Sequence, residues 1–308
     1  MKRRKFIGLA GLACGGAIIG GCSRGGDTTP VSGRKSIIDP AKGRGMVFVG
    51  KNPDPAEALK AAVAAFGGFG FIAPGSSVVL KPNAAWSRTP EQAANTDPRV
   101  LSEMIRLCRE AGAGKITVFE HTVDRPAAQV MAISGIAAAA RDGGAELIFA
   151  TSDRDFVSID VAGGKLLNRD TLAKIVLDAD VFINIPKAKH HSQTLLTLGL
   201  KNLMGVNFNR QLWHTGPDLH QYIADYATAV AVDLTVIDAS RIMLTNGPKG
   251  PGRTRDPHEI IVSYDRVAAD AYACTLFDLK PDAVPHVVMA GELGLGESAL
   301  EKIIVERV

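Results

Sequence analysis

The sequence predicts an α/β fold, in which one mainly parallel sheet is flanked by helices and carries a small inserted antiparallel hairpin. Short apolar strands alternate along the chain with helical patterns, the order expected of βαβ units with right-handed crossovers. Within residues 157–168, the apolar positions of VSID and KLLN flank Ala-Gly-Gly, a pattern typical of a hairpin. Since no internal repeat divides residues 46–308, we expect them to form a single domain.

Each element follows from its local pattern. The helix expected at 97–112 illustrates the reasoning, because Asp97 can cap it, Pro98 suits its first turn and Gly112 suits its end. The other helices are expected at residues 53–66, 126–142, 171–179, 192–204, 218–231 and 267–279. Strands are expected at the apolar runs 46–50, 77–80, 115–120, 145–150, 181–185, 233–238 and 259–264, and the segment from Pro285 to the end is expected to form a last strand–helix unit.

The first 22 residues, MKRRKFIGLAGLACGGAIIGGC, have the pattern of a targeting segment. Arg3 and Arg4 followed by Lys-Phe-Ile resemble a twin-arginine export signal, and Ile-Gly-Gly-Cys resembles a bacterial lipobox. The apolar run falls short of the roughly 18 residues of a spanning helix. We therefore expect a signal peptide over 1–21 and lipidation of Cys22. The alternative is an ordinary secretory signal that happens to contain Arg-Arg.

These signals predict the partners and the location of the chain. Its partners would be the twin-arginine export machinery and a membrane reached through the lipid anchor. Residues 22–45, rich in Gly, Ser, Thr and Pro, are expected to be a flexible tether. The chain would then be exported and lipid-anchored to a membrane on the periplasmic or extracellular side.

Charge and cysteine content exclude several classes of protein. Residues 1–21 hold four basic and no acidic residues, so their removal lowers the formal charge from +3 to −1, and no nucleic-acid partner is expected. Outside residues 1–22 the cysteines are Cys108 and Cys274, which form no CxxC pair. A cysteine-ligated iron–sulfur cluster within one chain is therefore not expected, nor is a cysteine-based zinc finger. Whether Cys108 and Cys274 pair is open.

Polar residues follow the predicted strands at the points where the strands end. Because the carboxyl ends of parallel strands share one edge of a sheet, these side chains should line one crevice there. They are Lys81 and Asn83, His121, Lys187 with His190 and His191, and Asp238. Lysine supplies positive charge, and imidazole supplies a proton acceptor near neutral pH. We expect the catalytic residues to be His121, His190 and Lys187, with His121 or His190 as general base.

The segment 184–205, NIPKAKHHSQTLLTLGLKNLMG, is the densest constellation. A helix from about Ser192 would point its amino terminus at the crevice and favour an anion. We expect the ligand-binding residues to be Lys81, Asn83, His191, Lys201, Asn202 and Asp238, and the ligand to be a small anion. Lys201 should be buried near Asn202 with Asp238 as its partner, because a charge inside an apolar run must reach solvent or serve a site. The alternative is a solvated basic turn before an amphipathic helix, and metal ligation by the histidines stays open.

Four blocks, LKPN at 80–83, NTDP at 95–98, IPKAKHHSQTLLTLGLKNLMG and VIDASRIMLTNGPKGPG, resemble a bacterial and archaeal family catalogued as domain of unknown function 362. Some relatives carry a ferredoxin-like segment and are labelled iron–sulfur proteins. This chain lacks the cysteines, so that property is not implied here. A weaker likeness, in residue types alone, is to nickel-dependent lactate racemases, which set Lys and His around a tethered cofactor and an α-hydroxy acid.

Three functions are consistent with these observations. The first is an enzyme or cofactor-dependent protein that binds an anionic small molecule, a carboxylate or a phosphate, at the carboxyl edge of the sheet. The second is a non-catalytic periplasmic ligand-binding or assembly lipoprotein that uses the same crevice. The third is racemase-like proton transfer on an α-hydroxy acid. The residues specify neither the cofactor, nor the substrate, nor the reaction.

Overall fold

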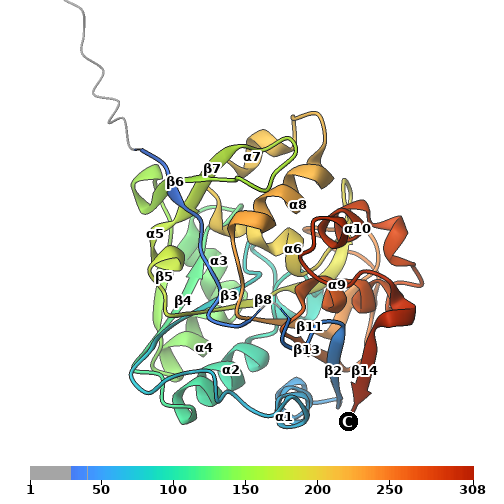
Figure 1. Cartoon of the computed structure of the whole chain (residues 1–308). Coiled ribbons are helices and arrows are strands. Elements are labelled where there is room, and N and C mark those ends of the chain that lie inside the picture. Colours follow the sequence, from blue (N-terminus) through green and yellow to red (C-terminus); the bar gives the residue numbers. More distant parts are fainter. Residues whose placement is uncertain (1–28, 40) are drawn as a thin grey trace, which may run out of the picture.

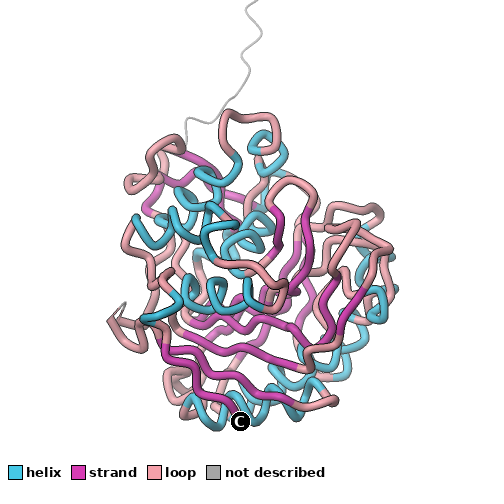
Figure 2. The backbone as a smooth tube through the Cα atoms, turned by 90° about the vertical axis from the view of Figure 1, so that its right-hand side faces the viewer, coloured by secondary structure: helices cyan, strands magenta, loops and turns pink. Residues whose placement is uncertain are grey.

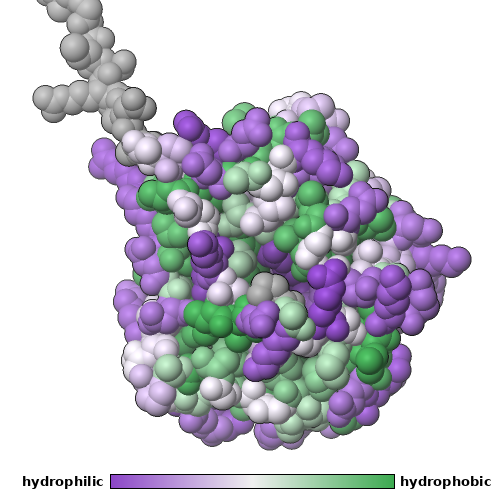
Figure 3. Space-filling view, viewed as in Figure 1, coloured by the Kyte–Doolittle hydropathy of each residue, from purple (hydrophilic) through white to green (hydrophobic). Residues whose placement is uncertain are grey.

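A computed structural model of the chain describes residues 29–39 and 41–308. The predicted signal peptide, the paired arginines and Cys22 lie outside the described residues. The domain has a large sheet with helices packed on both sides, as Figure 1 shows. On the face drawn in Figure 3, hydrophilic side chains dominate the outline and hydrophobic ones form small patches between them.

The main sheet is mostly parallel, as the alternating pattern predicts. Along it the strands follow the order β14-β2-β13-β11-β8-β3-β4-β5. All neighbours from β11 to β5 are parallel, whereas β13 runs antiparallel to both β11 and β2. These strands are β2 (Met46–Lys51), β3 (Ser77–Pro82), β4 (Lys115–Glu120), β5 (Glu146–Phe149), β8 (Val181–Ile185), β11 (Leu234–Met243), β13 (Glu259–Ser263) and β14 (Ile304–Arg307).

Helices form a layer on each face of this sheet, and each layer encloses its own core (Figures 1 and 2). On one face lie α1 (Pro55–Phe66), α2 (Pro98–Glu110) and α4 (Ile136–Asp142), with α3 (Ala127–Ile133) preceding the last of these. On the other lie α6 (Gly199–Asn202), α8 (Leu219–Ala229), α9 (Arg266–Thr275) and α10 (Pro285–Glu292).

Residues of one strand alternate between the two cores, as a pleated strand requires. Val78 and Leu80 of β3 pack with α1 and α2, and Val79 packs on the opposite side. The two cysteines belong to different cores, Cys108 to the first and Cys274 to the second, and both are free thiols. The question of a disulfide between them is thereby answered: they do not pair.

The predicted hairpin is present, but its strands lie further apart in sequence than expected. β6 (Phe156–Asp160) pairs antiparallel with β7 (Arg169–Ala173), and β1 (Val31–Ser32) adds a parallel strand to make a separate three-stranded sheet. The KLLN segment, expected to be the second strand, is a loop. Its amides at Leu166 and Leu167 donate to the Asp225 carboxylate of α8 at 2.7 and 2.9 Å, so they are not available to β6.

The prediction of a helix over residues 192–204 is wrong. β9 (Lys187–His191) and β10 (Leu195–Thr197) form an antiparallel pair, and only α6 and the 3-10 turn at Leu203–Val206 are helical. Because β9 also pairs with β11, sheet hydrogen bonding overrides the helical pattern of this segment. β12 (Thr254–Arg255) pairs with the end of β11.

Two other expectations also change at the level of single elements. Residues 169–173 form β7, so the helix predicted at 171–179 is reduced to α5 (Lys174–Leu177). After Pro285 the order is helix then strand, because α10 precedes β14 and β14 completes the sheet edge beside β2. A short α7 (Arg210–Trp213) lies in the loop before α8.

The segment before β2 contacts the domain over part of the stretch predicted as tether. Arg34 is buried, and its guanidinium pairs with the Asp233 carboxylate. Asp233 also accepts from the Ser36 hydroxyl at 2.6 Å, the Ile37 amide at 2.9 Å and the Phe182 amide at 2.7 Å. Within the described residues, strand pairing with the domain therefore begins at Val31. In the part of the chain that the structure describes, no helix has the length and apolar character needed to cross a membrane.

Candidate functional site

A cavity of about 310 Å³ lies at the carboxyl ends of β3 and β4. In the sheet, β4 and β5 lie on one side of β3, and β8 and β11 lie on its other side. Such a reversal of strand order opens a crevice at the carboxyl edge, where ligands of open α/β sheets bind. Loops after β3, the end of β4, β9, α6 and α7 all contribute to its wall.

The cavity wall has a strong excess of positive charge. Its cationic side chains are Lys81, Lys189, Lys201 and Arg210, all of them buried. Among the described residues, Glu120 is the one carboxylate in the wall. Burying a charge is costly unless an opposite charge or hydrogen bonds compensate it, so the partners of each cation determine what the cavity can bind.

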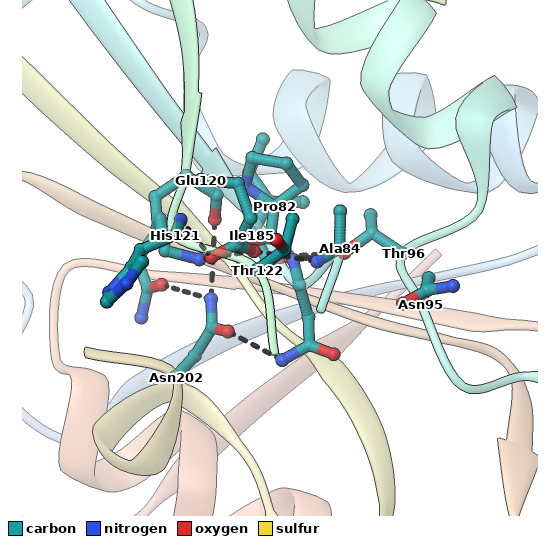
Figure 4. Close-up of polar contacts among 12 residues, drawn as sticks. Pro82, Ala84, Asn95, Thr96, Glu120, His121, Thr122, Ile185 and Asn202 are labelled. Carbon is teal, nitrogen blue, oxygen red and sulfur yellow. Dashed lines mark hydrogen bonds and ion pairs between the residues drawn. The ribbon is translucent and has the colours of Figure 1, made fainter. Parts of the chain in front are cut away.

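Lys81 is compensated by Glu120. Its Nζ lies 2.7 Å from Glu120 Oε2 and also donates to the Pro82 carbonyl at 2.5 Å. The carboxylate is fixed further by the amides of Ala84, at 2.7 Å, and His121, at 2.9 Å (Figure 4). Burial lowers the pKa of Lys81, and the Coulombic attraction of Glu120 opposes this. The pair joins the end of β3 to the end of β4, and both of its residues lie in the cavity wall.

Three asparagines form a connected chain of side-chain amides beside this pair. Asn83 Nδ2 donates to Asn202 Oδ1 at 2.8 Å, and Asn202 Nδ2 donates to Asn184 Oδ1 at 2.8 Å. Figure 4 shows Asn202 reaching from α6 toward the strand ends. The ammonium of Lys189 donates to Asn83 Oδ1 at 2.8 Å and to the Ala94 carbonyl. Burial lowers the pKa of Lys189 well below its ordinary value. These bonds fix the orientation of each amide.

Lys201 has different surroundings. Its Nζ lies 2.9 Å from the Met204 sulfur, and no oxygen among the described residues accepts a hydrogen bond from it. Burial, and next the positive charge of Arg210, lower the pKa of Lys201 to about 7. The predicted burial is confirmed, but the predicted partner is wrong: Asp238 is bound by the ammonium of Lys187 at 2.8 Å.

The position of Lys201 is set by a carboxylate at the start of α6. Asp270 of α9 accepts from the amides of Gly199 at 2.6 Å and Leu200 at 2.9 Å. Burial raises the pKa of this carboxyl to about 7, although both amides favour the ionised form. α6 is only one turn long, so this contact replaces the stability that a longer helix would have.

Two histidines of the wall are held neutral. His191 Nδ1 accepts from the amides of Gln193 at 3.1 Å and Thr194 at 3.4 Å, so the hydrogen of the neutral ring is on Nε2. Burial, followed by Lys201 and Lys189, lowers the pKa of His191 to about 2. The ring of His214 stacks on it at 6.1 Å between centroids, and burial lowers its pKa to about 4.

The structure brings five of the predicted residues together in the wall and leaves four outside it. Those in the wall are Lys81, Asn83, His191, Lys201 and Asn202. Those outside are His121, His190, Lys187 and Asp238. His121, next to Glu120, bonds the Asn207 carbonyl at 3.2 Å through Nδ1, and burial lowers its pKa to about 4. His190 Nδ1 accepts from the Gly247 amide at 3.1 Å.

Lys187 and Asp238 form a buried pair that ties two of the sequence blocks together. Asp238 accepts from Lys187 Nζ through Oδ2 and from the Asp97 amide through the same oxygen at 2.7 Å. Its other oxygen accepts from the amide and hydroxyl of Ser240 at 3.0 and 2.6 Å. With both carboxylate oxygens occupied, the pair connects β9, β11 and the start of α2 and lies outside the wall of the cavity described above.

Four ionisable residues of the wall are not among the predicted site residues: Glu120, Lys189, Arg210 and His214. Glu120 carries a weak signal, because it is the charged last residue of an apolar strand. Lys189 lies within the lysine–histidine block but was assigned no role. Arg210 has no local signal, since it is placed by tertiary bonds to the carbonyls of His121, at 2.5 Å, and Thr122, at 2.9 Å.

In residues 29–39 and 41–308, no three His, Cys, Asp or Glu side chains are grouped as metal ligands.

A family model described as "Domain of unknown function (DUF362)" matches residues 78–275, which include every residue of the cavity wall. The chain belongs to this family. A relative, the thylakoid-associated protein of Synechocystis sp., is 31% identical over 257 residues, which are 79% of this chain and 76% of the relative.

Two solved structures are also similar to this DUF362 chain. One is the lactate racemase apoprotein of Thermoanaerobacterium thermosaccharolyticum, with 9% identity over 80% of this chain and a TM-score of 0.49. The other is a protein of Thermotoga maritima, with 12% identity over 74% of this chain and a TM-score of 0.44. The chain spans only 62% and 60% of these proteins. At such scores neither likeness bears on the activity of the DUF362 domain.

Proposed function

We propose that this DUF362 protein is an enzyme that binds a small molecule bearing a carboxylate or phosphate group in the cavity. One observation carries the proposal: four buried cations face one carboxylate there. Glu120 compensates Lys81, whereas Lys201 and Arg210 have no carboxylate partner among the described residues. An anion entering the cavity gains the attraction of desolvated charges, which is stronger than in water. The anionic group belongs to the substrate or to a cofactor held with it.

Binding is tested by calorimetric titration of the protein with oxalate and with inorganic phosphate. We expect at least one of these anions to bind, and to raise the free energy of unfolding by about 2.7 kcal/mol at 100 times its Kd. Lys201→Met should weaken that binding, because it removes the amine that a bound anion would keep protonated. Lys60→Met is the matched control, since Lys60 is exposed on α1. The proposal fails if neither anion binds, or if both variants bind as the wild type does.

A non-catalytic ligand-binding protein is the alternative use of the same cavity. His191 distinguishes the two, because the Nε2 hydrogen of its neutral ring can be donated to an oxygen at the reacting atoms. His190 was the natural choice from sequence, but it lies outside the wall. If the protein is an enzyme, His191→Asn should lower kcat on a turned-over substrate with little change in affinity. Loss of affinity alone, with no reaction for the wild type on any anionic substrate offered, favours the binding protein.

We also propose that the chain is exported by the twin-arginine route and anchored through lipid on Cys22. The motif at Arg3 and Arg4 and the lipobox support this. The thylakoid association in the name of the Synechocystis relative is in keeping with a protein held at a membrane. Replacing Arg3-Arg4 by Lys-Lys should block export, measured by fractionation. Continued export of that variant through the general secretory route would refute the twin-arginine assignment.

A further inference from the structure

The three lysines of the cavity differ in what their ammonium groups contact. Lys81 has a carboxylate and a carbonyl oxygen, and Lys189 has an amide oxygen and a carbonyl oxygen. Lys201 has only the thioether of Met204. A thioether is a weak acceptor, so the protonated form of Lys201 is left without the oxygens that would stabilise it. Lys201 is therefore the lysine of the wall whose ammonium has no oxygen partner among the described residues.

The groups that face Lys201 act in the same direction. Arg210 on α7 is a cation, burial lowers the pKa of Lys189 on β9 well below its ordinary value, and the rings of His191 and His214 are neutral. Glu120 is the carboxylate of the wall, and it is bonded by Lys81 and two amides. A lysine that is desolvated and placed beside another cation is the arrangement that makes an amine nucleophilic at neutral pH. The cavity gives this amine access to a small molecule.

We propose that Lys201 is a catalytic nucleophile that forms an imine with a 2-oxo acid. This rests on the proposed function, because the remaining cations of the wall would hold the carboxylate while Lys201 attacks the adjacent carbonyl carbon. The nitrogen lone pair forms the carbon–nitrogen bond and the carbonyl oxygen becomes a hydroxyl. That hydroxyl takes its hydrogen from the amine, and its loss with the second amine hydrogen, as one water molecule, leaves the imine. No oxidant or reductant takes part.

The substrate class follows from the size and charge of the cavity. Its volume of about 310 Å³ is at the lower end for small-molecule sites, which favours a compact acid over a nucleotide. A carbonyl next to a carboxylate places the electrophilic carbon within one bond of the anchored group. His191 contributes a fixed Nε2 hydrogen that can bond an oxygen of such an acid.

The test is trapping of the imine in the full chain. The protein is incubated with glyoxylate or pyruvate and sodium cyanoborohydride at pH 7, and the modified lysine is located by peptide mass spectrometry. We expect one adduct, on Lys201, and labelling about tenfold or more above that of exposed Lys60, because far more of the buried amine is unprotonated at this pH. Oxalate should compete with the labelling.

Lys201→Arg is the matched variant, because it keeps the positive charge and removes the amine. It should give no adduct while binding oxalate within a few-fold of the wild type. Oxalate binding to the wild type without an adduct on Lys201 overturns the imine and leaves the proposed function standing. Absence of both binding and labelling overturns both. If the arginine variant does not fold, the site of labelling and the oxalate competition in the wild type still decide.

Discussion

Replacing Lys201 by methionine should stabilise the protein, and the gain should depend on pH in a way that identifies the cause. In the folded protein Lys201 loses its proton at a pKa of about 7, against 10.5 for the ordinary side chain. Between these values the unfolded chain holds a proton that the folded chain does not. The stability of the wild type therefore rises with pH over this window, and the contribution of Lys201 is least favourable near pH 7.

The size of the effect follows from the proton that is released. One proton corresponds to about 1.4 kcal/mol for each pH unit, so the wild type should gain about 2–3 kcal/mol from this residue between pH 7.5 and 9.5. Methionine cannot titrate. The stability advantage of Lys201→Met over the wild type should be largest near pH 7 and should shrink by that amount at pH 9.5.

Urea unfolding followed by circular dichroism measures this difference directly. Both proteins are unfolded at pH 7.5, 8.5 and 9.5, and the free energies are subtracted at each pH. Titration of the neighbouring Arg210 and Lys189 is common to both proteins and cancels in the subtraction, apart from its coupling to Lys201. A difference that stays constant across the three pH values would show that Lys201 is an ordinary protonated lysine, and the nucleophile assignment would fall with it.

Three further outcomes are expected. Lys187→Met should cost about 3–5 kcal/mol, measured by urea unfolding, because Asp238 would be left buried without its cation; unchanged stability with lost ligand binding would return Lys187 to the site. Stability should fall as pH drops below about 6.5, since His191 takes up a proton in the unfolded chain but not in the folded one until about pH 2, and His191→Asn should flatten that acid limb. Cys22→Ala or globomycin should abolish lipidation, read by mass spectrometry, whereas an intact unmodified 1–22 segment in the mature protein would contradict the lipobox.

Much of the sheet could be predicted because its strands are buried on both faces. Runs such as VFINI at 181–185 are apolar throughout and have few alternatives. The segment after Lys187 could not be predicted, because its helical pattern competes with pairing between β9 and β11, which lie some fifty residues apart. Local propensity is weak beside such tertiary contacts.

The same contrast applies to the site. Lys201 and Asn202 could be found because a charged and an amide residue interrupt an apolar run. Glu120 and Arg210 could not be assigned, since a single charge at a strand end or in a loop looks the same whether it faces solvent or a cavity. Their positions depend on bonds to residues distant in sequence, such as that of Glu120 to Lys81.

If Cys22 carries the proposed lipid, the contacts of Arg34 with Asp233 would limit how far the domain could stand from a bilayer. Because contacts with the domain begin near Val31, the chain between that residue and a lipid on Cys22 reaches at most about 30 Å. A domain of this size has a radius of gyration of about 19 Å, which corresponds to a diameter of about 50 Å, so the domain is wider than this length of chain. With the proposed lipid on Cys22, a tether of this length would keep the domain close to the bilayer, and its substrates would have to be met within the layer of solution next to the headgroups.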